Sequence, residues 1–160
     1  MPDPSHLPYR PNVGAVLFSS AGLVFVGQRA GFPGHWQLPQ GGIDEGEDLH
    51  LALKRELKEE IGTDNVEILA EHPDWLTYDL PPDLLGVAWH GKYRGQRQKW
   101  FALRFTGTDC EINLHAHAHP EFEEWRWVEL AQLPTLAIAF KREIYTQLAH
   151  DFAPYAHAAR

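Results

Sequence analysis

The hydrophobic pattern of the chain alternates between short apolar runs and turn-forming residues. Two apolar stretches, residues 11–18 and 23–28, are joined by Ser19–Gly22, which predicts a β-hairpin. Residues 30–40 contain several glycines and prolines and are predicted to form a loop. Four later runs predict further strands, over residues 66–69, 75–80, 99–106 and 125–128. Strands therefore dominate the predicted fold.

Two segments have helical periodicity instead. Residues 47–61 repeat apolar side chains every three or four positions, and Gly62 stands where a C′ glycine would end the helix. Residues 137–152 predict a second amphipathic helix. The order of elements shows no strict βαβ alternation and no internal repeat. The pattern predicts an α/β or α+β fold with a mixed sheet between helices, as a single domain over residues 1–160.

Composition narrows the class of protein. The chain has 160 residues, 44% hydrophobic and 22% charged, as is usual for a globular domain. It has one cysteine, Cys110, which excludes an intrachain disulfide and favours a reducing, cytoplasmic location. No apolar run is long enough to span a bilayer, and no secretory signal is visible. We therefore expect no membrane association.

The charge distribution bears on the partner. The formal net charge is -8, the wrong sign for binding nucleic acid by general phosphate neutralisation. An anionic substrate would need metal ions or a local basic group. Residues 92–104 contain five basic and no acidic side chains. That segment is either a solvated strand edge or a contact for an anion, and the sequence leaves both open.

Three glutamates in the first predicted helix carry the chemistry. Glu56, Glu59 and Glu60 stand at positions i, i+3 and i+4 and share one helix face, while Leu53 and Leu57 lie on a neighbouring stripe. Like charges at this spacing destabilise a helix unless something neutralises them. A solvated acidic face is one interpretation. The other is a site for Mg²⁺ or Mn²⁺, which prefer hard oxygen ligands.

The surrounding residues resemble the signature of a known family. Residues 41–63 match the Nudix box, G-x5-E-x7-R-E-U-x-E-E-x-G-U with U aliphatic, except that Thr63 takes the last aliphatic position. The resemblance implies an α/β/α sandwich. It also implies that Glu56, Glu59 and Glu60, with the Gly41 carbonyl, ligate catalytic Mg²⁺, for which Mn²⁺ is a possible substitute.

The same resemblance gives two further box residues a structural role. Glu47 and Arg55 would form a salt bridge that fixes the loop against the helix. Hydrolysis of a phosphoanhydride requires neutralised phosphoryl oxygens and an activated water, and carboxylate-bound metal ions supply both.

The resemblance extends outside the box, from about residue 9 to residue 152. Segments 9–14, 36–42, 95–101, 111–113, 120–122, 125–128 and 140–142 are similar to the Nudix group of bacterial RNA pyrophosphohydrolases and dinucleoside polyphosphate hydrolases. This similarity implies that Glu121 is a fourth acidic residue at the metal, as ligand or general base. It implies substrate contacts for a further set of residues, namely Arg10, Arg29, Gln40, Tyr78, Ile138, Phe140 and Lys141. Phe140 would stack on a base with Ile138 as its apolar partner.

One local feature falls outside that group. His115, His117 and His119 alternate just before Glu121. On a strand they would share a face and could bind Zn²⁺, whereas in an exposed loop they would bind nothing.

Three hypotheses follow. The first is hydrolysis at the 5′ end of RNA, which removes pyrophosphate from a triphosphate, or phosphate from a diphosphate, and leaves a 5′-monophosphate. The second is asymmetric hydrolysis of dinucleoside polyphosphates such as diadenosine tetraphosphate. The third is a nucleotide- or metal-binding module without turnover, against which the three intact glutamates argue. The sequence identifies no protein partner.

Overall fold

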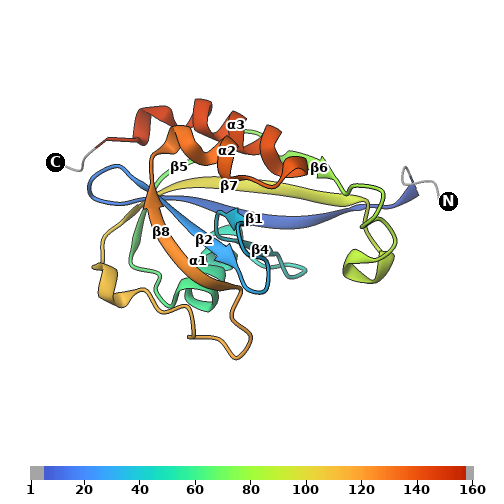
Figure 1. Cartoon of the computed structure of the whole chain (residues 1–160), viewed down its shortest axis with the longest axis horizontal. Helices are drawn as coiled ribbons and strands as arrows, with labels where there is room; N and C mark the ends of the chain where they lie inside the picture. Colours follow the sequence, from blue (N-terminus) through green and yellow to red (C-terminus); the bar gives the residue numbers. More distant parts are fainter. Residues whose placement is uncertain (1–5, 158–160) are drawn as a thin grey trace.

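A mixed sheet forms the centre of the molecule, and helices cover both of its faces (Figure 1). The computed structural model describes residues 6–157. The two longest strands, β1 (Tyr9–Phe18) and β7 (Gly95–Phe105), are parallel and paired along almost their whole length. The other strands are β2 (Val24–Arg29), β3 (Trp36–Gln37), β4 (Gln40–Gly42), β5 (Val66–Glu71), β6 (Leu76–Asp79) and β8 (Phe122–Val128).

The remaining strands extend the sheet by antiparallel pairing. β5 and β6 pair with β7, β4 pairs with β1, and β2 pairs with β1, β3 and β8. The helices are α1 (Leu49–Ile61), α2 (Leu133–Leu136) and α3 (Arg142–Asp151). Short 3-10 helices cover Ala88–Gly91, Asp109–Glu111, Leu130–Gln132, Ala139–Lys141 and Ala153–Tyr155.

The hydrophobic core lies in two layers, one on each face of the sheet. Alternate residues of a strand point to opposite faces. Val13 and Leu17 of β1 therefore pack in the cluster that includes Leu53 of α1. Val16 and Phe18 pack in the cluster that includes Tyr145 of α3. This arrangement is the α/β/α sandwich expected from the sequence.

Helix α1 has a defined cap at each end. The Asp48 carboxylate accepts the Leu51 N–H at 3.1 Å, so the helix begins at Leu49, two residues later than predicted. Gly62 ends it with φ 80°, a conformation that glycine adopts without strain, as predicted from its position. The Gly62 N–H donates to the Lys58 carbonyl at 3.1 Å. Glu47 consequently lies in the loop before the helix.

Several predicted boundaries need correction. The hairpin forms, but β1 and β2 pair only near Phe18 and Val24, because β4 occupies the edge of β1 farther along. The predicted loop 30–40 contains β3 and the start of β4. β7 and β8 begin four and three residues earlier, respectively, than the predicted strands. The apolar run underestimates β7 because the polar residues Gln96 and Gln98 are buried in it. It underestimates β8 because the exposed Glu123 and Glu124 follow Phe122.

The prediction of one helix over residues 137–152 is wrong at its start. The backbone of Ile138 is extended (φ -60°, ψ 147°), so no helix can pass through it. A 3-10 turn, Ala139–Lys141, follows, and α3 begins only at Arg142. The turn buries Lys141, which is 9% exposed. Among the described residues, no helix has the length and apolarity to cross a membrane.

Candidate active site

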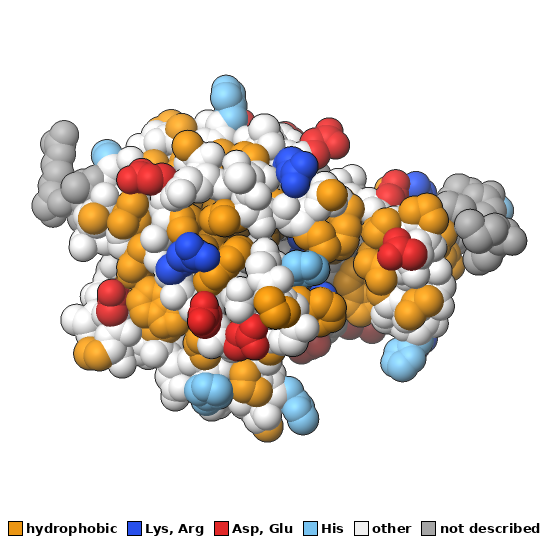
Figure 2. Space-filling view, in the orientation of Figure 1, with side chains coloured by type: hydrophobic (Ala, Val, Ile, Leu, Met, Phe, Trp, Pro, Cys, Tyr) orange, Lys and Arg blue, Asp and Glu red, His pale blue; other side chains and the backbone are white. Residues whose placement is uncertain are grey.

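A cleft of about 610 Å³ opens beside helix α1, which carries the glutamates of the Nudix box. Two groups of charged residues line it. The acidic cluster consists of Glu56, Glu59, Glu60 and Glu121, and the basic cluster consists of Arg10, Arg29 and Lys141. The structure therefore brings together side chains from α1, β1, β2, the turn before α3 and the loop before β8. Figure 2 shows a hollow on this face of the molecule, between the main body and the lobe formed by residues 81–94.

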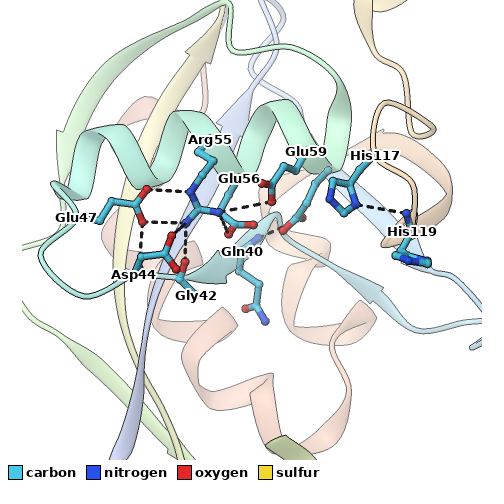
Figure 3. A network of polar contacts seen from close by, with 10 residues as sticks. Gln40, Gly42, Asp44, Glu47, Arg55, Glu56, Glu59, His117 and His119 are labelled. Atoms are coloured by element: carbon cyan, nitrogen blue, oxygen red, sulfur yellow. Dashed lines mark hydrogen bonds and ion pairs between the residues drawn. The ribbon is translucent and has the colours of Figure 1, made fainter.

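Helix α1 directs its glutamates toward the short strand β4 (Figure 3). Leu53 and Leu57 are buried in the core, which fixes the rotation of the helix and leaves Glu56 and Glu60 on the side of β4. The Gln40 N–H donates to Glu60 at 3.4 Å. Gly41 lies against the Glu56 carboxylate so closely that a Cβ there would overlap it. The absence of a side chain at Gly41 therefore allows this close approach.

Arg55 joins the loop before the helix to the glutamates Glu56 and Glu59 of α1. Its Nε and Nη2 donate to the two Glu47 carboxylate oxygens at 2.8 and 2.9 Å, and its Nη2 also donates to the Gly42 carbonyl at 2.9 Å. Its Nη1 donates to Glu56 at 2.8 Å and lies 3.5 Å from Glu59. The hydrogen bonds from Arg55, together with one from the Asp44 N–H, lower the pKa of Glu47 to about 2. The salt bridge implied by the sequence resemblance is present in the structure.

Burial disfavours the charged form of two carboxylates in the acidic cluster. Desolvation raises the pKa of Glu60 well above its usual value, and the neighbouring carboxylates of Glu56 and Glu121 add to the effect. Desolvation also raises the pKa of Glu56, although Arg55 partly opposes it. Like charges are thus held together in a low-dielectric site, and a bound cation would relieve their repulsion.

Glu121 and Lys141 connect the two clusters. Glu121 is exposed and accepts a hydrogen bond from the Gln37 side chain at 3.3 Å. Burial lowers the pKa of Lys141 to about 8, with a smaller contribution from Arg29, while Glu121 and Glu60 act in the opposite direction. The cleft therefore presents positive charge next to a set of carboxylates, as an anion bridged to a metal ion requires.

A network of buried amides that the sequence analysis missed lies at the base of the cleft. The Gln98 side-chain NH₂ lies within hydrogen-bonding distance of the side-chain oxygens of Asn12 (3.1 Å), Gln40 (2.8 Å) and Gln96 (3.2 Å). The Tyr78 hydroxyl donates to Gln96 at 2.8 Å. Gln96 and Gln98 alternate on β7, so the signal was a pair of amide side chains at a spacing of two, just before the apolar run of the strand.

The two aromatic residues predicted to contact the substrate, Tyr78 and Phe140, lie next to each other in the cleft. The rings of Tyr78 and Phe140 are 5.5 Å apart, and both line the cleft. Gln40 also lines it. Ile138 is half-buried and is not among the described residues that line the cleft, because the chain turns between it and Phe140.

The family model of the NUDIX domain matches residues 8–148. The chain belongs to the Nudix family. It is 59% identical to an RNA pyrophosphohydrolase of Acidiphilium cryptum, over 94% of this chain and 93% of that protein. It is 52% identical to an RNA pyrophosphohydrolase of Gluconacetobacter diazotrophicus, over 99% of this chain and 100% of that protein.

Solved structures agree with the assignment of the Nudix fold. An Ap4A hydrolase from C. elegans, solved as a binary complex, has a TM-score of 0.65 and 22% sequence identity to this chain. The match covers 91% of this chain and 98% of the C. elegans protein. At this level of identity the likeness bears on the fold alone, and it agrees with the sandwich described above.

Nudix hydrolases generally use divalent metal ions, and the residues of this cleft fit one. Among residues 6–157 no group of three or more His, Cys, Asp or Glu side chains forms a preassembled metal cage. Mg²⁺ does not require one, because it keeps several waters and takes one or two carboxylates together with substrate phosphates. The buried, mutually repelling carboxylates of Glu56 and Glu60, next to the Gly41 backbone, match that requirement.

The three alternating histidines do not form the zinc site considered from the sequence. Residues 115–119 form turns and bends rather than a strand, and among residues 6–157 these histidines belong to no group of three or more His, Cys, Asp or Glu side chains that could hold a metal ion. The backbone N–H of His115 donates to the Asn113 side chain at 2.9 Å and His115 does not line the cleft, whereas His117 and His119 do. The loop interpretation therefore describes the segment, and it adds two imidazoles to the Nudix site that the sequence analysis did not assign.

Proposed function

We propose that this Nudix protein is an RNA pyrophosphohydrolase. It would remove pyrophosphate from a 5′-triphosphate end of RNA, or phosphate from a 5′-diphosphate end, and leave a 5′-monophosphate. The observation that carries the proposal is the similarity to two RNA pyrophosphohydrolases at 59% and 52% identity over nearly the whole chain. The acidic and basic clusters in one cleft support it. A cytoplasmic location, expected from the single cysteine, stays a prediction.

Glu56, Glu59, Glu60 and the Gly41 carbonyl are the residues that would hold the metal ion, with Glu121 completing the site. When bound, Mg²⁺ would neutralise the phosphoryl oxygens and lower the pKa of an attacking water. A cation at this position would also favour the ionised forms of Glu56 and Glu60, whose pKa values burial raises.

The basic cluster would bind and orient the polyphosphate. Arg10 and Arg29 can offer two parallel N–H donors to phosphate oxygens, and the ammonium group of Lys141 lies in the same cleft. Glu121 is exposed at the cleft and would accept the proton of the attacking water, unless a box glutamate does so. Tyr78 and Phe140 offer aromatic surface to a base, and stacking of this kind tolerates different bases.

Purified protein with Mg²⁺ and 5′-triphosphorylated RNA tests the proposal. We expect release of pyrophosphate or orthophosphate and an RNA with a 5′-monophosphate, detected by its sensitivity to a 5′-monophosphate-dependent exonuclease. The matched substrate is diadenosine tetraphosphate under the same metal and salt, compared by kcat/KM. Intact RNA together with rapid hydrolysis of the dinucleotide would contradict the proposal and favour the second hypothesis.

A variant checks that the acidic cluster carries the activity. Glu59→Gln removes one carboxylate without changing side-chain size. We expect it to lose most of the RNA activity, and full activity in this variant would refute the metal assignment.

A further inference from the structure

The segment between β6 and β7 contains an unusual backbone. Trp89 and His90 both adopt the left-handed conformation, with φ 51° and 58° respectively. Apart from glycines, they are the two residues with positive φ among residues 6–157. Two consecutive side-chain-bearing residues in this conformation are strained, and such strain persists only where the surrounding structure holds it and often marks a functional position.

This backbone places the Trp89 indole at the cleft. Trp89 lines the cleft together with Ala88 and Leu84 of the same segment. It is only half-buried, although it packs partly against the core cluster on the α3 side of the sheet. Tyr93 lies edge-on to its ring, with the centroids 6.1 Å apart. The ring is thus held by neighbouring side chains and is partly exposed at the cleft.

Arg10 connects Trp89 to the catalytic residues. The Arg10 guanidinium stands 5.4 Å from the centre of the Trp89 ring. The same guanidinium packs against Gly42, where an added Cβ would overlap it. Gly42 follows Gly41, which lies against Glu56. The Arg10 guanidinium therefore contacts both the Trp89 indole and Gly42, next to the place where the phosphates and metal ion would bind.

We propose that Trp89 is a stacking surface for the nucleobase of the 5′-terminal nucleotide. The base on the ribose that carries the polyphosphate is the group that must lie close to the phosphate site. Aromatic rings bind bases through their faces regardless of base identity. Tyr78 and Phe140 form a separate aromatic pair, on β6 and in the turn before α3, so Trp89 adds an independent surface. This inference rests on the proposed function, because it presumes a nucleoside polyphosphate end.

Trp89 has one competing role, which is to position Arg10 through the cation–π contact. A substrate without the terminal base separates the two roles. We would compare a short RNA with a 5′-triphosphorylated adenosine and the same RNA with a 5′-triphosphorylated abasic ribose. Each is measured as kcat/KM with the wild type, Trp89→Ala and Trp89→Phe. The control, Val87→Ala, alters a 69%-exposed residue of the same segment.

The wild type should prefer the base-bearing RNA by about 5- to 160-fold, the range of one base–aromatic contact. Trp89→Ala should lose that preference and leave kcat/KM for the abasic RNA nearly unchanged. Trp89→Phe should keep most of the preference, and Val87→Ala should behave as the wild type. An equal loss of activity on both RNAs would show that Trp89 acts through Arg10 and would overturn the proposal. So would an unchanged preference in Trp89→Ala.

A binding measurement keeps this test separate from the proposed function. Equilibrium binding of the same two RNAs is measured with methylene groups in place of the bridging anhydride oxygens, so that no hydrolysis is needed. If the wild type failed to hydrolyse RNA, the proposed function would be wrong, yet the binding ratio would still report on Trp89. Equal affinity of the wild type for both analogues would overturn the stacking role whatever the hydrolysis assay showed.

Discussion

The acidic and basic clusters share one cleft but are built in different ways. Three of the four acidic residues come from little more than one turn of α1. The basic residues come from three separate places: Arg10 from β1, Arg29 from β2 and Lys141 from the 3-10 turn before α3. The acidic cluster is therefore a local feature of the sequence, whereas the basic cluster exists only because the sheet and α3 fold together.

The two clusters nevertheless have the same energetic character. Burial raises the pKa of Glu60 and lowers that of Lys141. Each cluster therefore contains an ionisable group whose charged form is disfavoured by removal from water. A site of this kind gains stability when a ligand of the opposite charge binds. The predictions below test whether each cluster acts on catalysis, on stability or on both.

The largest effect is expected for Glu60→Gln in the acidic cluster. RNA hydrolysis should fall by at least about 100-fold, because charge stabilisation of the reacting phosphoryl group is lost. The melting temperature at pH 7 should stay the same or rise, since a buried, repelled carboxylate is removed. The matched control is Glu67→Gln on β5, an exposed position that should alter neither property. Retained activity in Glu60→Gln would remove this residue from the metal site.

Lys141→Met tests the basic cluster. The kcat/KM should fall by about 10- to 100-fold, the loss of one hydrogen bond to a charged group. Stability should rise at neutral pH, because burial of the ammonium group costs free energy. The exposed Lys54→Met on α1 is the control.

The stability gain expected for Lys141→Met depends on pH, because the pKa of Lys141 is lowered to about 8 from an ordinary 10.5. Below pH 8 both the folded and unfolded states hold the proton, so the cost of burial is complete. Between pH 8 and 10.5 the unfolded chain binds more protons, and the wild type gains stability as pH rises. The advantage of Lys141→Met in urea unfolding should therefore shrink from pH 7 to pH 10. A constant advantage would contradict the buried charge.

Gln98→Leu tests the amide network at the base of the cleft. The substitution removes the donor to the side-chain oxygens of Asn12 and Gln40, and the Asn12 oxygen is buried, which should lower the free energy of unfolding by about 1–3 kcal/mol. Activity should fall less than in Glu60→Gln. Urea unfolding measures the loss, with Gln147→Leu on the exposed face of α3 as the control. Unchanged stability would show that the network is not structural.

The smallest effect is expected for Glu47→Gln, which removes the salt bridge to Arg55 but no cleft residue. The pKa of Glu47 is lowered to about 2 from 4.5, so its contribution to stability is present above pH 4.5 and is lost as pH falls toward 2. The wild type should be more stable than the variant at pH 7, and the difference should narrow as pH decreases below 4.5. Unfolding by urea at several pH values checks this, and a difference independent of pH would contradict it.

The local parts of the fold were predictable. The helix with its glutamates, the glycine that ends it and the class of sheet all follow from residues close together in sequence, whereas the N-cap at Asp48 was not predicted. The start of α3 was not predictable, because the amphipathic pattern continues through Ile138 although the backbone there is extended. The start of β7 was missed because buried polar residues such as Gln96 and Gln98 look exposed in a hydrophobic pattern. The start of β8 was missed because two exposed glutamates, Glu123 and Glu124, separate Phe122 from the apolar run.

The sequence by itself determined the glutamates of α1 in the acidic cluster, since residues three and four positions apart lie on the same face of a helix. It also determined the family, through the spacing of the Nudix box. Only the tertiary structure decided what that face meets. It placed Arg10, Arg29 and Lys141 beside the glutamates, joined Gln96 and Gln98 to Asn12, and held Trp89 at the cleft in a strained conformation. These neighbours come from distant segments, and their approach depends on strand pairing and core packing, which no local pattern encodes.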